Sequence, residues 1–166
     1  GLSINAKDVK GFFSDKDGWN KVVSDLETVI ADSRNKFPNL DQFLIGHSMG
    51  SWIALSALAK GLNIKGLILS GSSKVPTLVI KIQKILVNIQ IILFGKKSIS
   101  NLLNFLTIKT YNKSFTPNRT ESDWISADES NVDDYINDPL CGFQVTNLLW
   151  LDLANGLLSI FKNRAY

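Results

Sequence analysis

The residue types best suited to chemistry stand together at residues 46–50, which read Gly-His-Ser-Met-Gly. An apolar run precedes them, and a segment with helical spacing of apolar residues follows. A serine with a glycine two positions away on either side suits a strand-to-helix turn so sharp that the hydroxyl stands clear of a sheet. Side-chain bulk at Gly46 or Gly50 would crowd that turn. The pattern therefore indicates that Ser48 is a nucleophile for acyl transfer.

A helix that begins directly after Ser48 would point its amino terminus, which carries partial positive charge, at the carbon under attack. The backbone amide of Met49 can then donate a hydrogen bond to the developing oxyanion. Met49 is thus expected to act through its backbone and not through its sulfur. The plain alternative is an ordinary turn in which the two glycines relieve crowding. The strand and helix expected on either side favour the hydrolase interpretation.

His47 is the single histidine of the sequence and invites assignment as the general base. Neighbouring side chains diverge in so tight a turn, whereas a base must come within about 2.6–3.2 Å of the serine hydroxyl. We therefore expect His47 to pack beneath the turn and to hydrogen-bond to the backbone. Enzymes with this motif take their histidine from a later part of the chain. No histidine follows Ser48, so we expect an incomplete triad in these 166 residues.

The acidic residues after Ser48 offer no clear triad acid, because none follows an apolar strand. The run from Asp128 to Asp138 is typical of a solvated helix. Cys141 has no histidine partner except His47 and is expected to be a small buried side chain. One cysteine and one histidine exclude a Cys/His zinc site. We expect neither a metal nor a cofactor. The remaining acidic residues weighed here are Asp123, Glu129, Asp133, Asp134 and Asp152.

The elements that must position Ser48 alternate between helix and strand. Apolar residues share one face of a helix that begins near Gly18, and Asp15 or Asp17 can cap its start. Short apolar runs at residues 42–45 and 64–70 are typical of strands buried on both faces. A helix over residues 49–59 joins them. This alternation predicts an α/β fold with a doubly wound parallel sheet.

The second half of the chain has a different character. Residues 75–94 are long and apolar enough to invite a transmembrane interpretation. Central lysines cost about 2.5–3.5 kcal/mol each in a bilayer, and Lys81 and Lys84 lie three apart on one helical face. An amphipathic helix therefore fits this segment better. A second amphipathic helix is expected from about residue 144 to residue 162.

The composition, 45% apolar and 20% charged, is typical of a globular protein with one domain or one core with an insertion. The net charge is +3, and the basic residues are scattered along the chain, so we expect no nucleic-acid partner but a weak attraction to anionic lipid. A single cysteine favours a reducing compartment. The first residues show no signal-peptide pattern. We therefore expect a cytoplasmic protein with peripheral membrane contact.

These motifs resemble those of the monoacylglycerol lipase and lysophospholipase group of the α/β hydrolases, the serine aminopeptidase S33 type. The resemblance covers nearly the whole chain, and its later motifs belong to the cap of that group. The stretches that carry it, in order, are residues 11–13 with Gly18 and Trp19, 43–50, 67–71, 111–113, 119–121 with Asp123 and Trp124, and 138–143.

The resemblance implies that Ser48 is the nucleophile and that Met49 supplies an oxyanion amide. It also implies a partial hydrolase core over residues 1–73 and a largely helical cap over residues 74–166. The apolar segment 75–94 would line an acyl-chain entrance and rest on a lipid surface, although a helix facing the core would show the same pattern. The implied activity is that of a serine esterase or lipase on a single-chain glycerolipid or lysophospholipid.

The same resemblance implies that the first strands and the oxyanion loop lie before this sequence. The last strands, with the triad acid and histidine, would lie after it. We therefore expect the central part of a hydrolase, whose uncovered sheet self-associates or pairs with the missing segments. The alternative function is that of a catalytically inactive fragment, or of a lipid-binding or interaction module.

Overall fold

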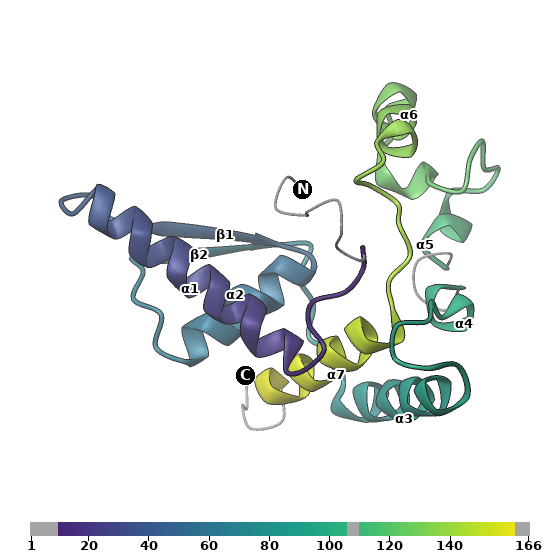
Figure 1. Ribbon diagram of the computed structural model, residues 1–166. Coiled ribbons are helices and arrows are strands. Elements are labelled where there is room, and N and C mark those ends of the chain that lie inside the picture. The colour runs from purple at the N-terminus through teal and green to yellow at the C-terminus, as the bar shows by residue number, and fades with distance from the viewer. Residues whose placement is uncertain (1–9, 106–109, 162–166) are drawn as a thin grey trace. The chain divides into compact units, whose positions relative to one another are not determined.

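The computed structural model describes residues 10–105 and 110–161 (Figure 1). By their contacts they form two compact units. Of the described residues, one unit comprises 13–89 and 148–161, and the other comprises 10–12, 90–105 and 110–147. The boundary that the sequence predicts after residue 73 is the point where a cap segment is inserted into the hydrolase core. Compactness does not test that boundary, so it stays a prediction.

The first unit contains the α/β part of the chain. Its helices and strands match the elements that the sequence predicts, which confirms an α/β class with parallel strands and flanking helices. They are α1 (Gly18–Lys36), β1 (Phe43–His47), α2 (Met49–Ala59), β2 (Gly66–Ser70), most of α3 (Thr77–Phe94) and nearly all of α7 (Asn147–Phe161).

The two strands pair in parallel, with Ile45 opposite Ile68, and α2 connects them. Gly46 is buried on the side of the sheet that packs against α2. On the other side Phe43, Ile45 and Ile68 are 64%, 68% and 54% exposed. The expectation that both strands are buried on both faces is therefore wrong for the described residues. An apolar run without alternation allows a strand to be buried on both faces, but it does not show which other elements cover those faces.

Helix α1 is held by Trp19, which is almost fully buried together with Val23. The indole N–H of Trp19 donates to the hydroxyl of Ser56 on α2, over 3.0 Å. A Cβ at Gly156 would lie 2.1 Å from the Trp19 ring, so only glycine lets α7 come this close. One side chain thus joins three helices of the unit. Most of α7 is buried, and its exposed residues, Asn155 and Ser159, lie four apart on one face, as expected for the amphipathic helix that the sequence predicts.

The amino terminus of α1 lies close to a side chain that is far away in the sequence. Asp17 occupies the N-cap position in a left-handed conformation, with φ of 53°, but its side chain makes no capping hydrogen bond. Asp152 on α7 instead faces the backbone N–H groups of Gly18 and Trp19. The pKa of Asp152 is raised to about 6, mainly by burial and in smaller part by the charge of Asp17, while the two backbone N–H groups act to lower it. The expected position of Asp17 at the helix start is therefore confirmed, but its side chain makes no capping hydrogen bond.

The raised pKa of Asp152 predicts a pH-dependent stability. The folded state holds the proton up to about pH 6, whereas the unfolded chain loses it near 3.8. The free energy of unfolding should therefore fall as the pH rises from 4 to 6, by at most about 3 kcal/mol. In Asp152→Asn this part of the pH dependence should vanish, as measured by urea unfolding at several pH values. Asp25→Asn, an exposed position on α1, is the control and should retain it.

The second unit consists of short helices and turns. One of its buried polar residues is Asn112, whose side chain donates to the carbonyl of Thr120 at 2.8 Å and accepts from the N–H of Trp124 at 3.1 Å. Its elements are α4 (Asn101–Asn104), α5 (Thr110–Asn112), η2 (Lys113–Phe115), η3 (Asp123–Ile125) and α6 (Glu129–Asn137). These elements confirm the largely helical character that the resemblance implies for this region.

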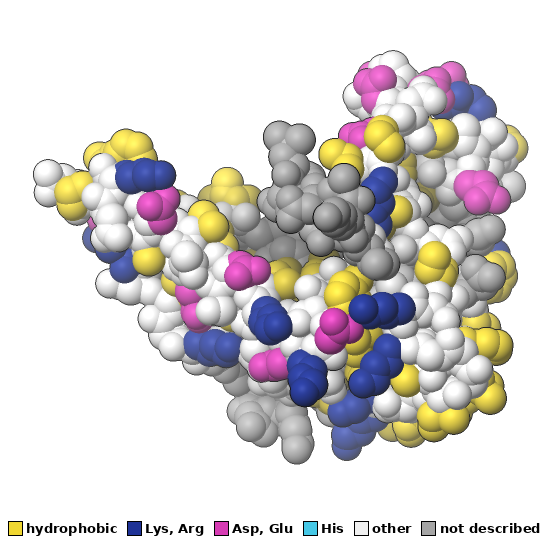
Figure 2. All heavy atoms as spheres, viewed as in Figure 1, with side chains coloured by type: hydrophobic (Ala, Val, Ile, Leu, Met, Phe, Trp, Pro, Cys, Tyr) yellow, Lys and Arg dark blue, Asp and Glu magenta, His cyan; other side chains and the backbone are white. Residues whose placement is uncertain are grey.

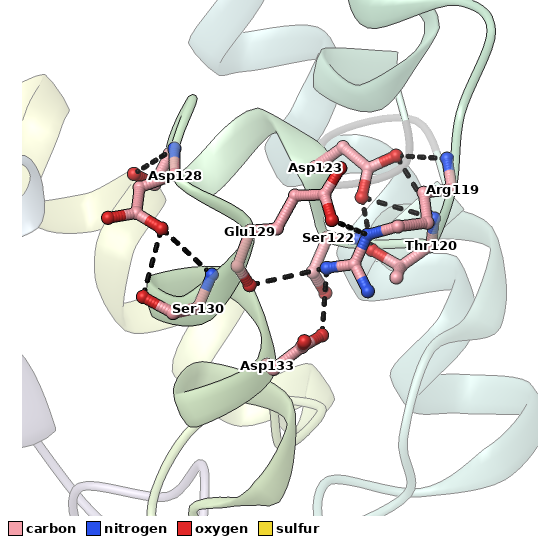
Figure 3. A network of polar contacts seen from close by, with 9 residues as sticks. Arg119, Thr120, Ser122, Asp123, Asp128, Glu129, Ser130 and Asp133 are labelled. Carbon is pink, nitrogen blue, oxygen red and sulfur yellow. Dashed lines mark hydrogen bonds and ion pairs between the residues drawn. The ribbon is translucent and has the colours of Figure 1, made fainter.

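A polar network joins α6 to the turn before η3 (Figure 3). The Arg119 guanidinium binds Asp133 at 2.7 Å and lies 3.8 Å from the carboxylate of Glu129. The backbone N–H groups of Arg119 and Thr120 donate to Asp123, and hydrogen bonds from Thr120 lower the pKa of that carboxyl. The acidic residues of this region therefore shape the turn and the start of α6. This arrangement agrees with the solvated helix that the sequence predicts from Asp128 to Asp138.

Candidate active site

Ser48 stands between the last residue of β1 and the first residue of α2, and it is exposed. Its backbone has φ of 51° and ψ of −124°, a combination that residues with a side chain rarely adopt. Such a conformation costs about 1–3 kcal/mol and persists only where the surroundings enforce it. The sharp strand-to-helix turn that the sequence predicts is therefore present at this serine.

Three hydrogen bonds enforce the Ser48 conformation. The Ser48 N–H donates to the carbonyl of Ser70 at the end of β2, over 3.0 Å. The Ser48 carbonyl accepts from the N–H of Ser51 at 2.9 Å and from the hydroxyl of Ser51 at 2.6 Å. Ser51 is fully buried, so the two donors to the Ser48 carbonyl come from inside the protein. Both polar backbone groups of the strained residue are thus satisfied.

The segment that follows β2 braces the first turn of α2 from outside. The Ser72 hydroxyl lies 2.8 Å from the Ser51 hydroxyl as its hydrogen-bond partner, and the Trp52 indole donates to the carbonyl of Ser73 at 3.0 Å. Sequence reasoning missed Ser51, Ser70 and Ser72 as supports of the turn. The sequence feature that could have indicated them is the position of residues 70–73 directly after the neighbouring parallel strand. Functional groups in parallel sheets gather at this carboxyl edge.

The two glycines of the motif differ in what they make room for. A Cβ at Gly46 would lie 2.8 Å from both the Gly50 carbonyl oxygen and the Ser51 Cα, backbone atoms that cannot move aside. A Cβ at Gly50 would meet nothing within 4 Å. The prediction that bulk is excluded at both positions is therefore confirmed for Gly46 and wrong for Gly50. The motif shows that both positions are glycine, but it does not show how close the neighbouring atoms are to each.

These two glycines allow a matched substitution test of the turn. Gly46→Ala should lower the free energy of unfolding by about 1–3 kcal/mol, because the added methyl group overlaps fixed backbone. Gly50→Ala should leave it unchanged or raise it by up to about 1 kcal/mol, because alanine favours a helix. Chemical denaturation of the two variants provides the comparison. Equal effects of the two substitutions would contradict the close contact at Gly46.

Met49 is the first residue of α2, and the first N–H groups of a helix have no acceptor within it. The first turn of α2 contains no acidic residue, and the Ser48 side chain makes no capping hydrogen bond. The partial positive charge of this terminus is thus not neutralised from within the helix. The placement suits the oxyanion role that the sequence assigns to the Met49 amide, and that role stays a prediction.

His47 does not lie where the sequence predicts. It is exposed on the uncovered face of the sheet, and its Nδ1 is 3.2 Å from the Ser70 hydroxyl. The expected position beneath the turn, with a backbone partner, is wrong. The reason is the register of the strands, which pairs His47 with Ser70 on one face. No hydrogen bond links His47 to Ser48 in the described part of the chain, and the incomplete triad that the sequence predicts stays a prediction.

Cys141 is partly exposed and not buried as expected from sequence. Its Sγ lies 3.6 Å from a carboxylate oxygen of Asp138, and partial burial together with that negative charge raises the thiol pKa. A thiol with a raised pKa is a poor nucleophile. Within residues 10–105 and 110–161, no three His, Cys, Asp or Glu side chains are grouped closely enough to bind a metal ion.

With this turn established, the chain can be compared with known families. The family model described as serine aminopeptidase, S33 (Hydrolase_4) matches residues 9–165. The chain belongs to this S33 hydrolase family. The match agrees with the α/β-hydrolase resemblance that the sequence motifs carry, and it places the two-stranded sheet with its flanking helices as part of an α/β-hydrolase fold. No curated protein matches the chain.

Two solved structures are similar to this S33 family chain to different degrees. A thermostable carboxyl esterase from Bacillus coagulans, solved with glycerol, is 25% identical with a TM-score of 0.69, over 81% of this chain and 44% of the esterase. A monoacylglycerol lipase from Paleococcus ferrophilus is 18% identical with a TM-score of 0.49, over 84% of this chain and 48% of the lipase. The chain thus spans less than half the length of each of these two proteins.

Proposed function

We propose that this protein hydrolyses carboxylic esters and that Ser48 is the nucleophile. The observation that carries the proposal is the strained, exposed Ser48 between β1 and α2, held by Ser51 and Ser70. An unstrained serine in a loop would need none of these supports. Membership of the S33 family and the likeness to a carboxyl esterase support the same reaction class.

In the proposed reaction the Ser48 oxygen attacks the ester carbonyl carbon and forms a tetrahedral intermediate. The backbone amide of Met49 donates to the oxyanion. The alcohol then leaves, and water hydrolyses the acyl-serine. A general base has to accept the serine proton, and none is hydrogen-bonded to Ser48 among the described residues. We propose that this base belongs to a part of the fold outside these residues, as expected for a chain that spans 44% of the esterase.

As substrate we propose a single-chain glycerolipid or a lysophospholipid. The apolar surface of α3 supports this choice, because an acyl chain or a lipid aggregate can pack against it. The competing proposal is a lipid-binding or interaction module without catalysis. It is favoured by one observation, namely that the single histidine is bound to Ser70 and not to Ser48.

Reaction with a fluorophosphonate probe tests the nucleophile, and release of fatty acid from monoolein or lysophosphatidylcholine tests the substrate. In a chain extended by its native flanking segments, Ser48 should be labelled and both activities should vanish in Ser48→Ala. Residues 1–166 alone should react at least about a hundredfold more slowly, because general-base catalysis typically contributes 10²–10⁴-fold. Ser73→Ala, which removes a neighbouring hydroxyl, is the control and should react normally.

Each alternative has its own result in this experiment. Equal labelling rates for the short and the extended chain would contradict the incomplete machinery. Absence of labelling in both would favour the non-catalytic module. Cleavage of aminoacyl anilides without cleavage of esters would replace the proposed substrate class with peptides.

A further inference from the structure

The carbonyl of Ser48 and the amide of Met49 belong to one trans peptide group. Such a group is planar, so its C=O and N–H point in opposite directions and turn together. The N–H is the donor that the proposed function assigns to the oxyanion. The C=O accepts both hydrogen bonds from Ser51. Whatever holds this carbonyl in place therefore also holds the direction of the Met49 N–H.

This peptide group needs an anchor, because the strain of Ser48 acts on its orientation. The φ of 51° lies in the left-handed region, but the ψ of −124° is far from the value of about 47° that suits this region. Any relaxation of ψ rotates the peptide group and turns the Met49 N–H away. Two bonds from Ser51 oppose that rotation, and the one from its hydroxyl, at 2.6 Å, is shorter than the one from its N–H, at 2.9 Å.

The direction of the hydrogen bonds in the serine hydroxyls follows from their chemistry. A carbonyl only accepts, so the single proton of the Ser51 hydroxyl lies on its bond to Ser48. The Ser72 hydroxyl, 2.8 Å away, is then the donor to the Ser51 oxygen. Hydrogen bonds in such a chain polarise and strengthen one another. Ser72 thereby keeps the Ser51 proton directed at the Ser48 carbonyl.

Helix α2, which carries Ser51, packs against both β1 and α1. Figure 2 shows basic and acidic side chains next to one another along α1, the helix so labelled in Figure 1, so the outer side of α1 faces solvent. Ser51 is fully buried beneath these elements, whereas Ser72 is exposed. A buried hydroxyl has to find its partners within the protein. The hydroxyl chain therefore runs from the residues after β2 into the interior and ends on the Ser48 carbonyl.

We propose that Ser51 and Ser72 are positioning residues for the oxyanion donor. Their two hydroxyls hold the peptide group between Ser48 and Met49 so that its N–H points toward the reacting group. Both residues act through this peptide group and not by contact with the substrate. The inference deepens the proposed function and rests on it for the reaction. The anchoring of the peptide group can be measured without any reaction.

Hydrolysis of p-nitrophenyl butyrate by the chain with its native flanking segments tests the effect on the reaction. Ser51→Ala should lower kcat at least about tenfold, since complete loss of one oxyanion donor costs about 10²–10³-fold. Ser72→Ala should lower kcat about threefold, as expected for one neutral hydrogen bond. Ser72→Thr, which keeps a hydroxyl at an exposed position, should restore it. KM should stay within about twofold, because the oxyanion forms only during the reaction.

Ser73→Ala is the matched control, because Ser73 is the exposed neighbour of Ser72 and contacts α2 through its backbone carbonyl. It should keep the kcat of the unchanged protein. Nuclear magnetic resonance supplies a measurement that needs no activity. The carbonyl carbon shift of Ser48 and the amide nitrogen shift of Met49 should change together in Ser51→Ala and Ser72→Ala. Both shifts should stay as they are in Ser73→Ala.

Unchanged kcat in Ser51→Ala, or a raised KM with unchanged kcat, would overturn the proposal. Peptide shifts that match those of Ser73→Ala would overturn it as well. If Ser51→Ala does not fold by circular dichroism, the comparison of Ser72→Ala with Ser72→Thr decides. If the unchanged protein neither hydrolyses the ester nor reacts with a fluorophosphonate, the proposed function is wrong. The shifts alone then decide whether the hydroxyls hold the peptide group.

Discussion

The Ser48 carbonyl accepts two hydrogen bonds from Ser51, and the Ser48 N–H donates to the carbonyl of Ser70. These bonds hold a conformation that costs about 1–3 kcal/mol and that an isolated turn would not keep. Because one partner is on α2 and the other at the end of β2, the strand pair and the helix must both be in place. The exposed hydroxyl is therefore a product of the whole β1–α2–β2 unit.

The rest of the first unit keeps that βαβ segment in place. Trp19 joins α1 to α2 through Ser56, and Gly156 lets α7 pack against the same ring. The carboxyl group of Asp152 lies at the start of α1, and its burial there raises its pKa. Removing either contact would loosen α1, which packs on α2, and through α2 the turn itself.

The features that the sequence predicted well depend on neighbours along the chain. The turn at Ser48, the two strands, and helices α1, α2, α3 and α7 follow from apolar spacing and from Gly46, whose missing side chain the structure explains. Such patterns act over three to eight residues and can be recognised without a fold.

The features that it missed depend on residues far apart in sequence. The position of His47 follows from its register opposite Ser70, and the exposure of Phe43 and Ile45 follows from what covers the sheet. The carboxylate that lies near the start of α1 belongs to Asp152, more than a hundred residues later. Gly50 is an error of another kind. The motif predicts crowding at this position, but a Cβ there would meet no atom within 4 Å.

The backbone of Ser48 is tested most directly by two substitutions that remove the same hydroxyl. At φ of 51° and ψ of −124° glycine is unstrained, whereas alanine keeps the strain. Ser48→Gly should therefore have a free energy of unfolding about 1–2 kcal/mol above that of Ser48→Ala. If Ser48→Gly is the less stable of the two, as in an ordinary turn, the strained serine on which the proposed chemistry depends is absent.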